Sequence, residues 1–321
     1  MADAPDPSFW HGQRVAVTGG AGFLGSAVVR DLEALGADTR VIRSSEFDLR
    51  SPEATREAVE GVEVVMHLAA RVGGIGFNRR NPAPLAYDNL VMGTNVFEQT
   101  RLAGVRKLVA ACSVCAYPNV TPVPFKEDDL WIGYPEASNA PYGLAKKMLL
   151  VLSDAYRRQY GFDSCAPVIA NLYGPGDNFD LEDSHVIAAM TRKFVEASEA
   201  GTEEVVLWGT GRPSREFLYV DDAARALILC AERLDSSAPV NIGTGVETSI
   251  ASLASALQEL SGFGGEVIWD TSKPDGQPSR YLDVSRARRL LEFEADTTLE
   301  DGLRQTVESF RRQQHAPAAV Q

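Results

Sequence analysis

A glycine-rich turn near the start of the chain constrains the fold more than any other feature. RVAVTG, residues 14–19, is rich in β-branched residues, and GAGFLG follows it at once. Residues 26–36 then carry apolar side chains at helical spacing and end in a glycine. In such a strand–turn–helix unit Gly19 permits the tight turn, Gly22 lets a pyrophosphate approach the backbone, and Gly25 allows close helix–strand packing. A glycine triplet alone is a weak signal, but its place at the start of an alternating pattern predicts dinucleotide binding.

Strands and helices alternate along the first half of the chain. We expect further strands at 39–42, 62–70 and 107–114, and helices at 51–61, 84–104 and from Asn139 onward. Strands that alternate with helices at this spacing pair in parallel through right-handed crossovers. The pattern therefore predicts an α/β fold with a doubly wound parallel Rossmann sheet and a smaller mixed α/β substrate domain.

The predicted domain organisation follows from where this alternation begins and ends. Residues 1–12 are interpreted as a loose N-terminal tail, and residues 13–177 with about 210–245 as the dinucleotide-binding domain. Residues 178–209 and 246–321 form the predicted substrate domain. It should close over the carboxyl ends of the strands, where ligands bind in such folds.

Composition excludes several classes of partner. The formal net charge is −13 and the pI about 4.9, which argues against nucleic acid or an anionic membrane as the main partner. No run approaches the ~18 apolar residues of a membrane span, and the acidic N-terminus has no apolar leader. We expect a cytoplasmic protein that holds any anionic ligand with locally placed basic residues.

The end of the second strand bears on the choice of dinucleotide. An acid at this point accepts from the 2′-hydroxyl of NAD, whereas an arginine favours the 2′-phosphate of NADP. Arg43 occupies the position in VIRSSEFDL, so NADP is favoured. Glu46 leaves NAD open, a solvated surface charge is the alternative for Arg43, and Asp48 is expected near the adenine.

Two cysteines three residues apart, Cys112 and Cys115, admit several interpretations. The chain has no second C-x-x-C and only scattered histidines, so neither zinc nor another metal is expected. A thioredoxin-like pair opens a helix, whereas KLVAACSV is typical of a strand that runs up to the pair. Cys112 fits a buried strand position, and Cys115 lies beyond the strand end.

The next helix carries a tyrosine and a lysine on one face. Tyr142 and Lys146 are four residues apart, so they lie one above the other. A tyrosine with a reference pKa of ~10 is a poor acid–base group at neutral pH unless a nearby cation favours its phenolate. Lys146 can supply that charge, whereas Lys147 lies about 100° round the helix. With Ser113 just beyond the preceding strand, these residues predict a hydride-transfer site.

Motifs along nearly the whole chain carry a resemblance to a known family. TGGAGFLG, Ser113 and PYGLAK resemble the extended short-chain dehydrogenase/reductases. The resemblance narrows with HLAARVGGI, CSVCAYP, NAPYGLAKKM, NLYGPGDNF, DSHVIAAM, VVLWGTGRPSREFLYVDD, NIGTG and KPDGQPSRYLDV, which together are similar to the GDP-L-fucose synthase family. That family reduces a GDP-4-keto-6-deoxy-hexose with NADPH after inverting two ring carbons. The resemblance thus implies NADP as cofactor and a nucleotide-diphosphate sugar, expected to be GDP-linked, as substrate.

The resemblance also implies roles for individual residues. It assigns Ser113, Tyr142 and Lys146 to the hydride-transfer triad, and Cys115 and His185 to an acid–base pair for the inversion. The implied cofactor contacts are Gly19, Gly22, Phe23, Leu24, Gly25, Arg43, Asp48, Leu68, Ala69, Ala70, Tyr142, Lys146 and His185. The implied substrate contacts are Asn171, Val186, Lys193, Trp208, Arg215 and Lys273.

The chemistry of a keto sugar suits the implied acid–base pair. A C4 ketone acidifies the hydrogens on C3 and C5, so a base on one face and an acid on the other can invert these centres through an enolate. A thiol and an imidazole, with reference pKa values of ~8.5 and ~6.5, suit this work better than carboxylates. On the residues alone, the favoured interpretation of His185 is a histidine at a helix start that bonds only to backbone, and that of Trp208 is a core tryptophan. The resemblance reverses the preference for His185.

Two rival functions stay open at this point. An epimerase that keeps NAD oxidised would invert ring centres without net reduction, and a non-catalytic dinucleotide sensor can use the same fold. Retention of Ser113, Tyr142 and Lys146 argues against the sensor. The segments 84–102 and 140–156 are apolar beyond one stripe, which is compatible with a homodimer through a four-helix seam as in the family, or with burial inside the monomer.

Overall fold

The central feature of the molecule is a five-stranded sheet, seen in a computed structural model that describes residues 4–181, 183–273 and 275–315. All neighbouring strands in it run parallel. In spatial order they are β2 (Asp38–Ile42), β1 (Arg14–Thr18), β3 (Val64–His67), β4 (Lys107–Ala110) and β6 (Ser164–Cys165). Every residue of β3 and β4 is buried, as expected for strands covered on both faces. The predicted doubly wound parallel sheet is confirmed.

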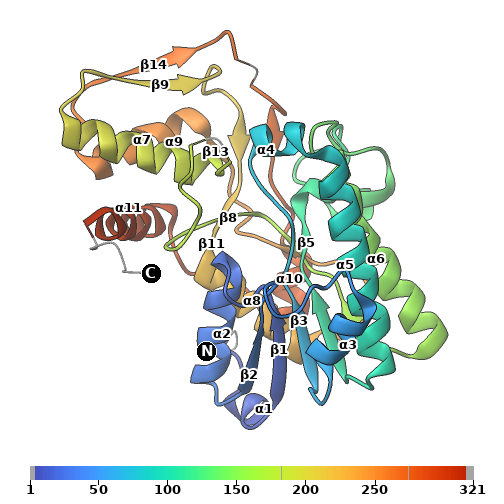
Figure 1. Cartoon of the computed structure of the whole chain (residues 1–321). Coiled ribbons are helices and arrows are strands. Elements are labelled where there is room, and N and C mark those ends of the chain that lie inside the picture. The colour runs from blue at the N-terminus through green and yellow to red at the C-terminus, as the bar shows by residue number, and fades with distance from the viewer. Residues whose placement is uncertain (1–3, 182, 274, 316–321) are drawn as a thin grey trace.

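Helices cover both faces of this sheet (Figure 1). On one face lie α2 (Phe23–Ala34) and α8 (Val220–Arg233), which pack against each other. On the other face lie α3 (Pro52–Val59), α5 (Pro82–Leu102) and α6 (Ala140–Tyr160). The side chain of Ser51 accepts a hydrogen bond from the Ala54 N–H, so it caps α3. Gly161, in the left-handed region with φ 65°, ends α6.

The chain changes sheets directly after β4, which the sequence did not predict. Residues 107–114 were expected as one strand, but β4 ends at Ala110, and Cys112–Ser113 forms the separate strand β5. β5 pairs in parallel with β7 (Val168–Ile169), and β7 pairs with β12 (Asn241–Ile242). The 3-10 helix η1 (Val114–Ala116) follows at once. The change of direction places Ser113 and Cys115 above the carboxyl end of the main sheet.

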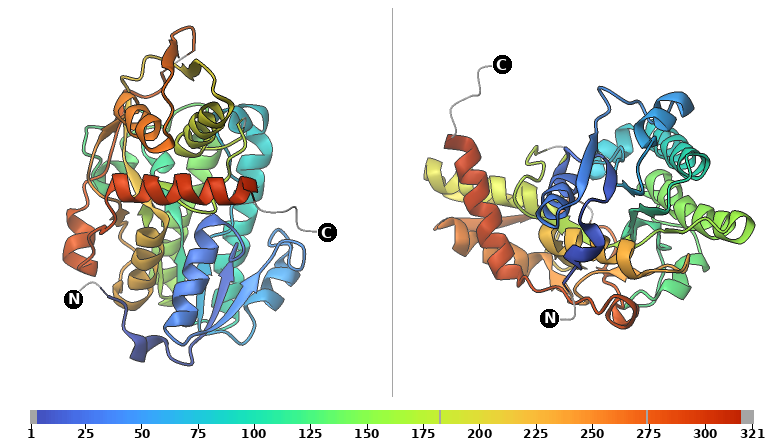
Figure 2. Two further views of the ribbon diagram at one scale, coloured as in Figure 1. Left: turned by 90° about the vertical axis from the view of Figure 1, so that its left-hand side faces the viewer. Right: turned by 90° about the horizontal axis from the view of Figure 1, so that it is seen from below.

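A smaller unit stands above the main sheet in Figure 1. Its helices are α7 (Val186–Ala200), α9 (Ile250–Ser261) and α11 (Leu299–His315), and α11 crosses beneath the other two in Figure 2. Its strands are β9 (Glu204–Trp208) with β14 (Glu266–Asp270), and β10 (Ser214–Arg215) between β13 (Thr248–Ser249) and β15 (Ser279–Arg280). β8 (Asn171–Tyr173) and β11 (Phe217–Tyr219) pair in parallel with each other, and their residues pack into both hydrophobic cores. These elements share a second hydrophobic core that includes Phe194, Leu253 and Leu303, as a mixed α/β domain requires.

Two segments differ from the predicted domain boundaries. Pro7–Trp10 forms the short helix α1 rather than a loose tail, because the fully buried Trp10 packs into the first core and donates from Nε1 to Glu232. Helix α10 (Ser285–Leu291) was assigned to the substrate domain, yet Leu291 and the following Phe293 pack into the first core. Residues 1–3 and 316–321, at the ends of the predicted domains, lie outside the described residues.

Two further helical elements are short. They are the helix α4 (Ile75–Arg80) and the 3-10 helix η2 (Glu127–Trp131). Among the helices that the structure describes, none has the length and apolar character needed to cross a membrane.

Candidate functional site

The glycine turn is packed so tightly that side chains are excluded from it. Gly19 has φ 70°, and a Cβ there would lie 2.9 Å from the backbone N of Ala69. A Cβ on Gly25 would lie 2.0 Å from the carbonyl O of Gly19. Gly22 is the N-cap of α2 and offers no capping side chain, so the first N–H groups of the helix are available to an anion. These features form a cradle that fits a dinucleotide pyrophosphate.

Substitution of Gly25 tests this packing. We expect Gly25→Ala to weaken NADPH binding at least tenfold and to lower the thermal midpoint, because the new methyl group collides with backbone that cannot move aside. The matched control is Gly264→Ala, since a Cβ at Gly264 meets no atom within 4 Å. Fluorescence titration with NADPH and thermal unfolding of both variants measure the effect. Equal affinities in the two variants would contradict the assignment.

Arg43 lies beside this turn. The Gly19 N–H donates to the carbonyl O of Ile42, the residue before Arg43. Within the part of the chain that the structure describes, the guanidinium of Arg43 is exposed and has no hydrogen bond or ion pair. It is therefore free to meet a 2′-phosphate, as the sequence predicts for NADP.

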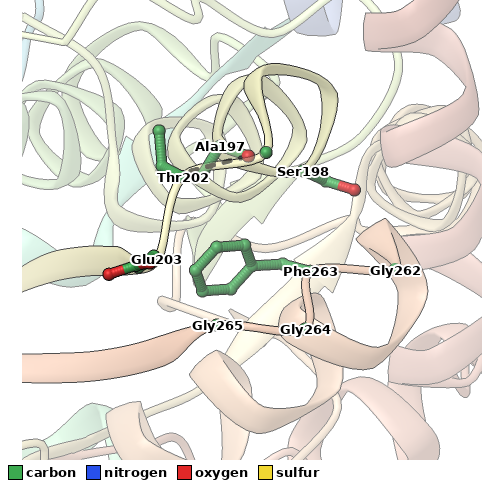
Figure 3. A pocket seen from close by; sticks show the side chains of 9 residues that line it. Ala197, Ser198, Thr202, Glu203, Gly262, Phe263, Gly264 and Gly265 are labelled. Atoms are coloured by element: carbon green, nitrogen blue, oxygen red, sulfur yellow. Dashed lines mark hydrogen bonds between the residues drawn. The ribbon is translucent and has the colours of Figure 1, made fainter.

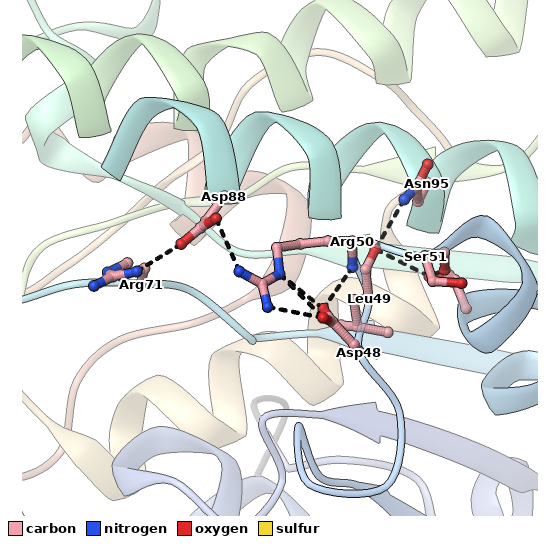
Figure 4. Close-up of polar contacts among 8 residues, drawn as sticks. Asp48, Leu49, Arg50, Ser51, Arg71, Asp88 and Asn95 are labelled. Atoms are coloured by element: carbon pink, nitrogen blue, oxygen red, sulfur yellow. Dashed lines mark hydrogen bonds and ion pairs between the residues drawn. The ribbon is translucent and has the colours of Figure 1, made fainter. Parts of the chain in front are cut away.

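Asp48 belongs to a charge network that joins three segments around the cofactor side of the sheet (Figure 4). Its carboxylate accepts from Arg50, and hydrogen bonding to the Arg50 side chain lowers the pKa of Asp48 to about 2. Arg50 and Arg71 also pair with Asp88 of α5. Asn89 exchanges hydrogen bonds with the backbone of Arg71. The network holds the loop after β3 in place, which is the role the structure offers for Asp48.

Thr18 and His67 support the same loop from below. The Thr18 Oγ1 accepts from the N–H groups of Leu68 and Ala69, both at 3.2 Å. Its own proton must therefore go to Nδ1 of His67, 2.8 Å away. This bond requires a neutral imidazole, and burial lowers the pKa of His67 to about 3. His67 must therefore stay uncharged to hold Thr18, and Thr18 in turn holds the backbone of the predicted cofactor residues Leu68 and Ala69, next to Ala70.

Acid should consequently destabilise the protein through His67. Unfolding restores a pKa near 6.5, so the unfolded state binds the proton more strongly and the folded state loses stability as pH falls below about 6.5. We expect His67 to account for a loss of about 3 kcal/mol in the free energy of unfolding between about pH 6.5 and pH 4. Urea titrations of the wild type and of His67→Gln at several pH values test this. Parallel pH profiles of the two proteins would refute it.

Ser113, Tyr142 and Lys146 meet where α6 starts beside β5. The hydroxyl of Ser113 is near enough to Tyr142 to influence the pKa of its phenol, and it accepts from the backbone N–H of Cys115 at 3.2 Å. The Nζ of Lys146 lies 5.9 Å from the centre of the Tyr142 ring and donates to the carbonyl O of Ala111 at 2.9 Å. Lys147 instead points away from them and donates to the carbonyl O of Leu130. The structure brings the three predicted residues together.

One electrostatic expectation is not met. We predicted that Lys146 lowers the pKa of Tyr142, but burial raises the pKa of this phenol. Burial also lowers the pKa of Lys146 itself to about 8, and the ammonium group of Lys146 donates a hydrogen bond to the carbonyl O of Ala111. The phenol is consequently protonated at neutral pH, which suits a group that donates a proton.

The two cysteines of the C-x-x-C pair lie in different environments. Cys112 is buried, its Sγ contacts the carbonyl O of Lys146 at 3.4 Å, and burial raises its pKa to about 12. Cys115 is partly exposed on η1, and its thiol forms no disulfide. A Cβ on Gly143 would lie 2.2 Å from the carbonyl O of Cys115, so only glycine lets η1 pack against α6 here. The close packing holds Cys115 beside the first turn of α6, which carries Tyr142.

His185 is the N-cap residue of α7 in the smaller unit, and the charge of Arg280, which contacts Cys115, acts on it. His185 is exposed to solvent, although many protein atoms surround its ring. Burial, and then the positive charge of Arg280, lower its pKa. No hydrogen bond joins its ring to any other described residue. The imidazole is thus available to a ligand.

The predicted substrate residues fall into two groups. Asn171 and Arg215 lie near Cys115, where burial and then the charge of Arg280 lower the pKa of Arg215 to about 10. The other group lies further out: Val186 packs against the second core, and Lys193 donates to the carbonyl O of Val206. Trp208 is 67% exposed, with the Nζ of Lys273 5.6 Å from its ring. Such an aromatic face open to solvent is not a core position, and it could stack on a planar base.

Comparison with known proteins agrees with this geometry. The model of the NAD dependent epimerase/dehydratase family matches residues 15–243. A putative GDP-L-fucose synthase 2 of Arabidopsis thaliana is 40% identical over 92% of this chain and 91% of its own length. The GDP-L-fucose synthase of Escherichia coli is 39% identical, with 94% of this chain and 98% of the relative covered. The chain belongs to the GDP-L-fucose synthase group of this family.

Solved structures support the same placement within the family. A GDP-6-OMe-4-keto-L-xylo-heptose reductase from C. jejuni has a TM-score of 0.88 at 28% identity and covers 94% of this chain and 98% of its own. A GDP-L-fucose synthetase from Naegleria fowleri, bound to NADP, has a TM-score of 0.86 at 31% identity and covers 95% and 94%. The prediction of an NAD(P)-dependent enzyme is therefore confirmed.

The sequence missed two charged residues that shape the site of this family member. Arg280 on β15 reaches Asn171 with Nη2 at 3.0 Å and the Sγ of Cys115 with Nη1 at 3.9 Å. Glu216 is 1% exposed and accepts from the N–H groups of Gly245 and Leu282. For Glu216, the sequence shows only a carboxylate that stands between Arg215 and an apolar strand. A carboxylate buried at such a position needs N–H donors. Glu216 thereby ties the strands that carry Arg215 and Arg280 to the NIGTG loop.

A separate hollow lies at the far end of the smaller unit (Figure 3). It is lined by the turns that follow α7 and α9, among them Thr202, Glu203 and Phe263. Left-handed Gly201 and Gly262 end the two helices there. None of the predicted site residues lines it, so it is not the catalytic cleft.

Proposed function

We propose that this enzyme converts a GDP-linked 4-keto-6-deoxy-hexose by inverting C3 and C5 and then reducing C4 with NADPH. One observation carries the proposal: an accessible thiol, Cys115, lies next to the Ser113–Tyr142–Lys146 group. A reductase needs only the latter. A second acid–base group beside it gives the site a means of inverting stereocentres as well.

The residues that would hold the cofactor fit NADP. The cradle of Gly19, Gly22 and Gly25 accommodates the pyrophosphate, and the unpaired Arg43 suits the 2′-phosphate. Phe23 and Leu24 open α2, and the backbone at 68–70 lies against Gly19. When bound, NADPH supplies the hydride that reduces the C4 carbonyl.

Inversion would use Cys115 and His185 from opposite walls of the cleft. One removes the proton from the carbon next to the ketone and the other returns a proton to the opposite face. The hydroxyl groups of Ser113 and Tyr142 stabilise the enolate oxygen while the proton is absent. An imidazole with a lowered pKa is neutral at physiological pH and can accept a proton.

Reduction would then draw a proton from Tyr142. Because burial keeps this phenol protonated, it can donate to the C4 oxygen as the hydride arrives. Lys146 lies below the ring and, with a pKa of about 8, is largely charged at pH 7, so it stabilises the phenolate that forms.

Two arginines supply a place for the diphosphate of the substrate. Arg215 and Arg280 are register partners on β10 and β15. In the described part of the chain neither has a carboxylate partner. Two like charges side by side repel each other, and a dianionic group between or above them removes that repulsion.

The test is to incubate the protein with GDP-4-keto-6-deoxy-mannose and NADPH, follow the nicotinamide absorbance, and identify the sugar by NMR. We expect NADPH oxidation with GDP-L-fucose as product. Inverted sugar without NADPH loss would make the enzyme an epimerase. If GDP-4-keto-6-deoxy-mannose is not turned over and a GDP-4-keto-heptose is reduced, the substrate belongs to the heptose class instead.

We also propose that two copies associate through α5 and α6. These helices pack side by side, and α6 exposes Leu144, Met148 and Val151 at intervals of four and three residues. Tyr87 on α5 is 63% exposed. Such a stripe fits the two-fold seam expected in the family. Light scattering should give twice the chain mass, and Met148→Glu should give the monomer.

A further inference from the structure

Arg280 contacts Cys115 and acts electrostatically on His185. Its Nη1 lies 3.9 Å from the Sγ of Cys115 on η1, and its charge acts on His185 at the start of α7. Its Nη2 donates to the Oδ1 of Asn171 at 3.0 Å. The Nδ2 of Asn171 donates in turn to the carbonyl O of Glu216 at 2.8 Å. Both ends of the Asn171 amide are therefore used to orient Arg280.

The charge of Arg280 is not neutralised by its protein neighbours. Its partners are the uncharged amide of Asn171 and the thiol of Cys115. The buried Nε has no acceptor in the described part of the chain. Arg215, its register partner, adds a second positive charge whose own donors go to the carbonyl groups of Ser214 and Gln277. An uncompensated guanidinium in a partly buried site favours an anion next to it.

We propose that Arg280 is a positioning residue for Cys115: its guanidinium orients the Sγ toward the substrate and stabilises the thiolate. The thiolate is the form of cysteine that accepts a proton, so Arg280 prepares Cys115 for its part in the inversion. That part rests on the proposed function, whereas the contact between guanidinium and thiol does not. In this arrangement one residue links the proposed diphosphate site to the acid–base pair.

Other titratable groups also face Cys115 and must be held constant in a test. Tyr142 faces it from α6, Cys112 from β5, and Arg215 from β10. Tyr142 and Cys112 have raised pKa values and stay uncharged near neutral pH. Arg215 stays charged below about pH 10. Lys146, whose pKa is about 8, also changes charge between about pH 6 and pH 9. The effect of Arg280 is therefore taken as the difference between the profiles of the wild type and the variant, which share Lys146.

The experiment measures the rate at which iodoacetamide alkylates Cys115 in the full chain across this pH range, without substrate or NADPH. Mass spectrometry of the Cys115 peptide gives the rate. We expect Arg280→Gln to move the midpoint of the rate–pH profile upward by about one unit and to slow alkylation near neutral pH about tenfold. Arg280→Lys should restore most of the rate. Asn171→Ala, which leaves Arg280 in place but unoriented, should shift the midpoint in the same direction by less.

Two controls separate this role from a structural one. Arg212→Gln removes an exposed arginine of the same unit and should leave the profile unchanged. The buried thiols of Cys112, Cys165 and Cys230 should stay unreactive in every variant, and their alkylation would reveal a folding defect. If Arg280→Gln shows such a folding defect, the rate–pH profile of Asn171→Ala tests the inference in its place. Coincident midpoints for wild type and variants overturn the inference, whatever the enzyme turns over. A shifted midpoint without turnover of the GDP-keto sugar overturns only the proposed function.

Discussion

Replacing Tyr142 by phenylalanine should lower the rate of NADPH-dependent reduction by about 10³-fold, the loss typical of a missing general acid. The ring of Tyr142 is 9% exposed and packs beside η1, and phenylalanine preserves that packing. Only the phenolic O–H is lost, and with it the proton that the C4 oxygen receives. Burial raises the pKa of Tyr142 and keeps its phenol protonated near neutral pH, so the substitution removes a group that carries its proton at the pH of the assay.

Inversion should survive the same substitution far better than reduction. Cys115 and His185 remain in place, and Ser113 still stabilises the enolate oxygen. Exchange of the C3 and C5 hydrogens with D₂O, followed by NMR, measures inversion separately from NADPH absorbance. Tyr160→Phe is the matched control, since Tyr160 lies at the exposed end of the same helix. Unchanged NADPH oxidation by the Tyr142 variant would remove this residue from the mechanism.

The sequence predicted those parts of the fold that short-range periodicity determines. β1, β3 and the helices α2, α3, α5 and α6 were all anticipated, because each has one repeating apolar pattern and a cap or glycine at its boundary. The break after β4 was missed because Ala111 and Cys112 are as apolar as the residues before them. Pairing of β5 with β7, more than fifty residues away, decides where the strand divides.

The same reasoning explains which site residues the sequence could not reveal. Tyr142 and Lys146 are neighbours on one helix, so their spacing is informative. Arg280 contacts Cys115 across 165 residues of sequence, and only the pairing of β10 with β15 brings it there. The burial of Trp10 could not be predicted for the same reason, since its hydrogen-bond partner Glu232 is separated from it by 222 positions in the sequence. Long-range pairing positions the site, and it leaves little trace in local composition.

Substitution of Cys115 should separate the two chemistries that the site combines. We expect Cys115→Ser to slow inversion at C3 and C5 by about 10²–10⁴-fold, because a serine hydroxyl neither ionises near neutral pH nor accepts the sugar proton. NADPH binding should be unchanged, since Cys115 lies on η1 and not in the cradle of Gly19 and Gly25. NADPH should still be oxidised slowly when the 4-keto sugar is present.

The product of that slow reaction gives the strongest evidence. If Cys115 serves inversion alone, the variant must yield a sugar reduced at C4 that keeps the original configuration at C3 and C5. Cys112→Ser is the control three residues away: it places a hydroxyl in a buried site and should lower stability without changing the product. Inversion at the wild-type rate in Cys115→Ser would leave the thiol without a chemical role. Its contact with Arg280 would then be only a packing contact, and His185 would need a different partner across the sugar ring.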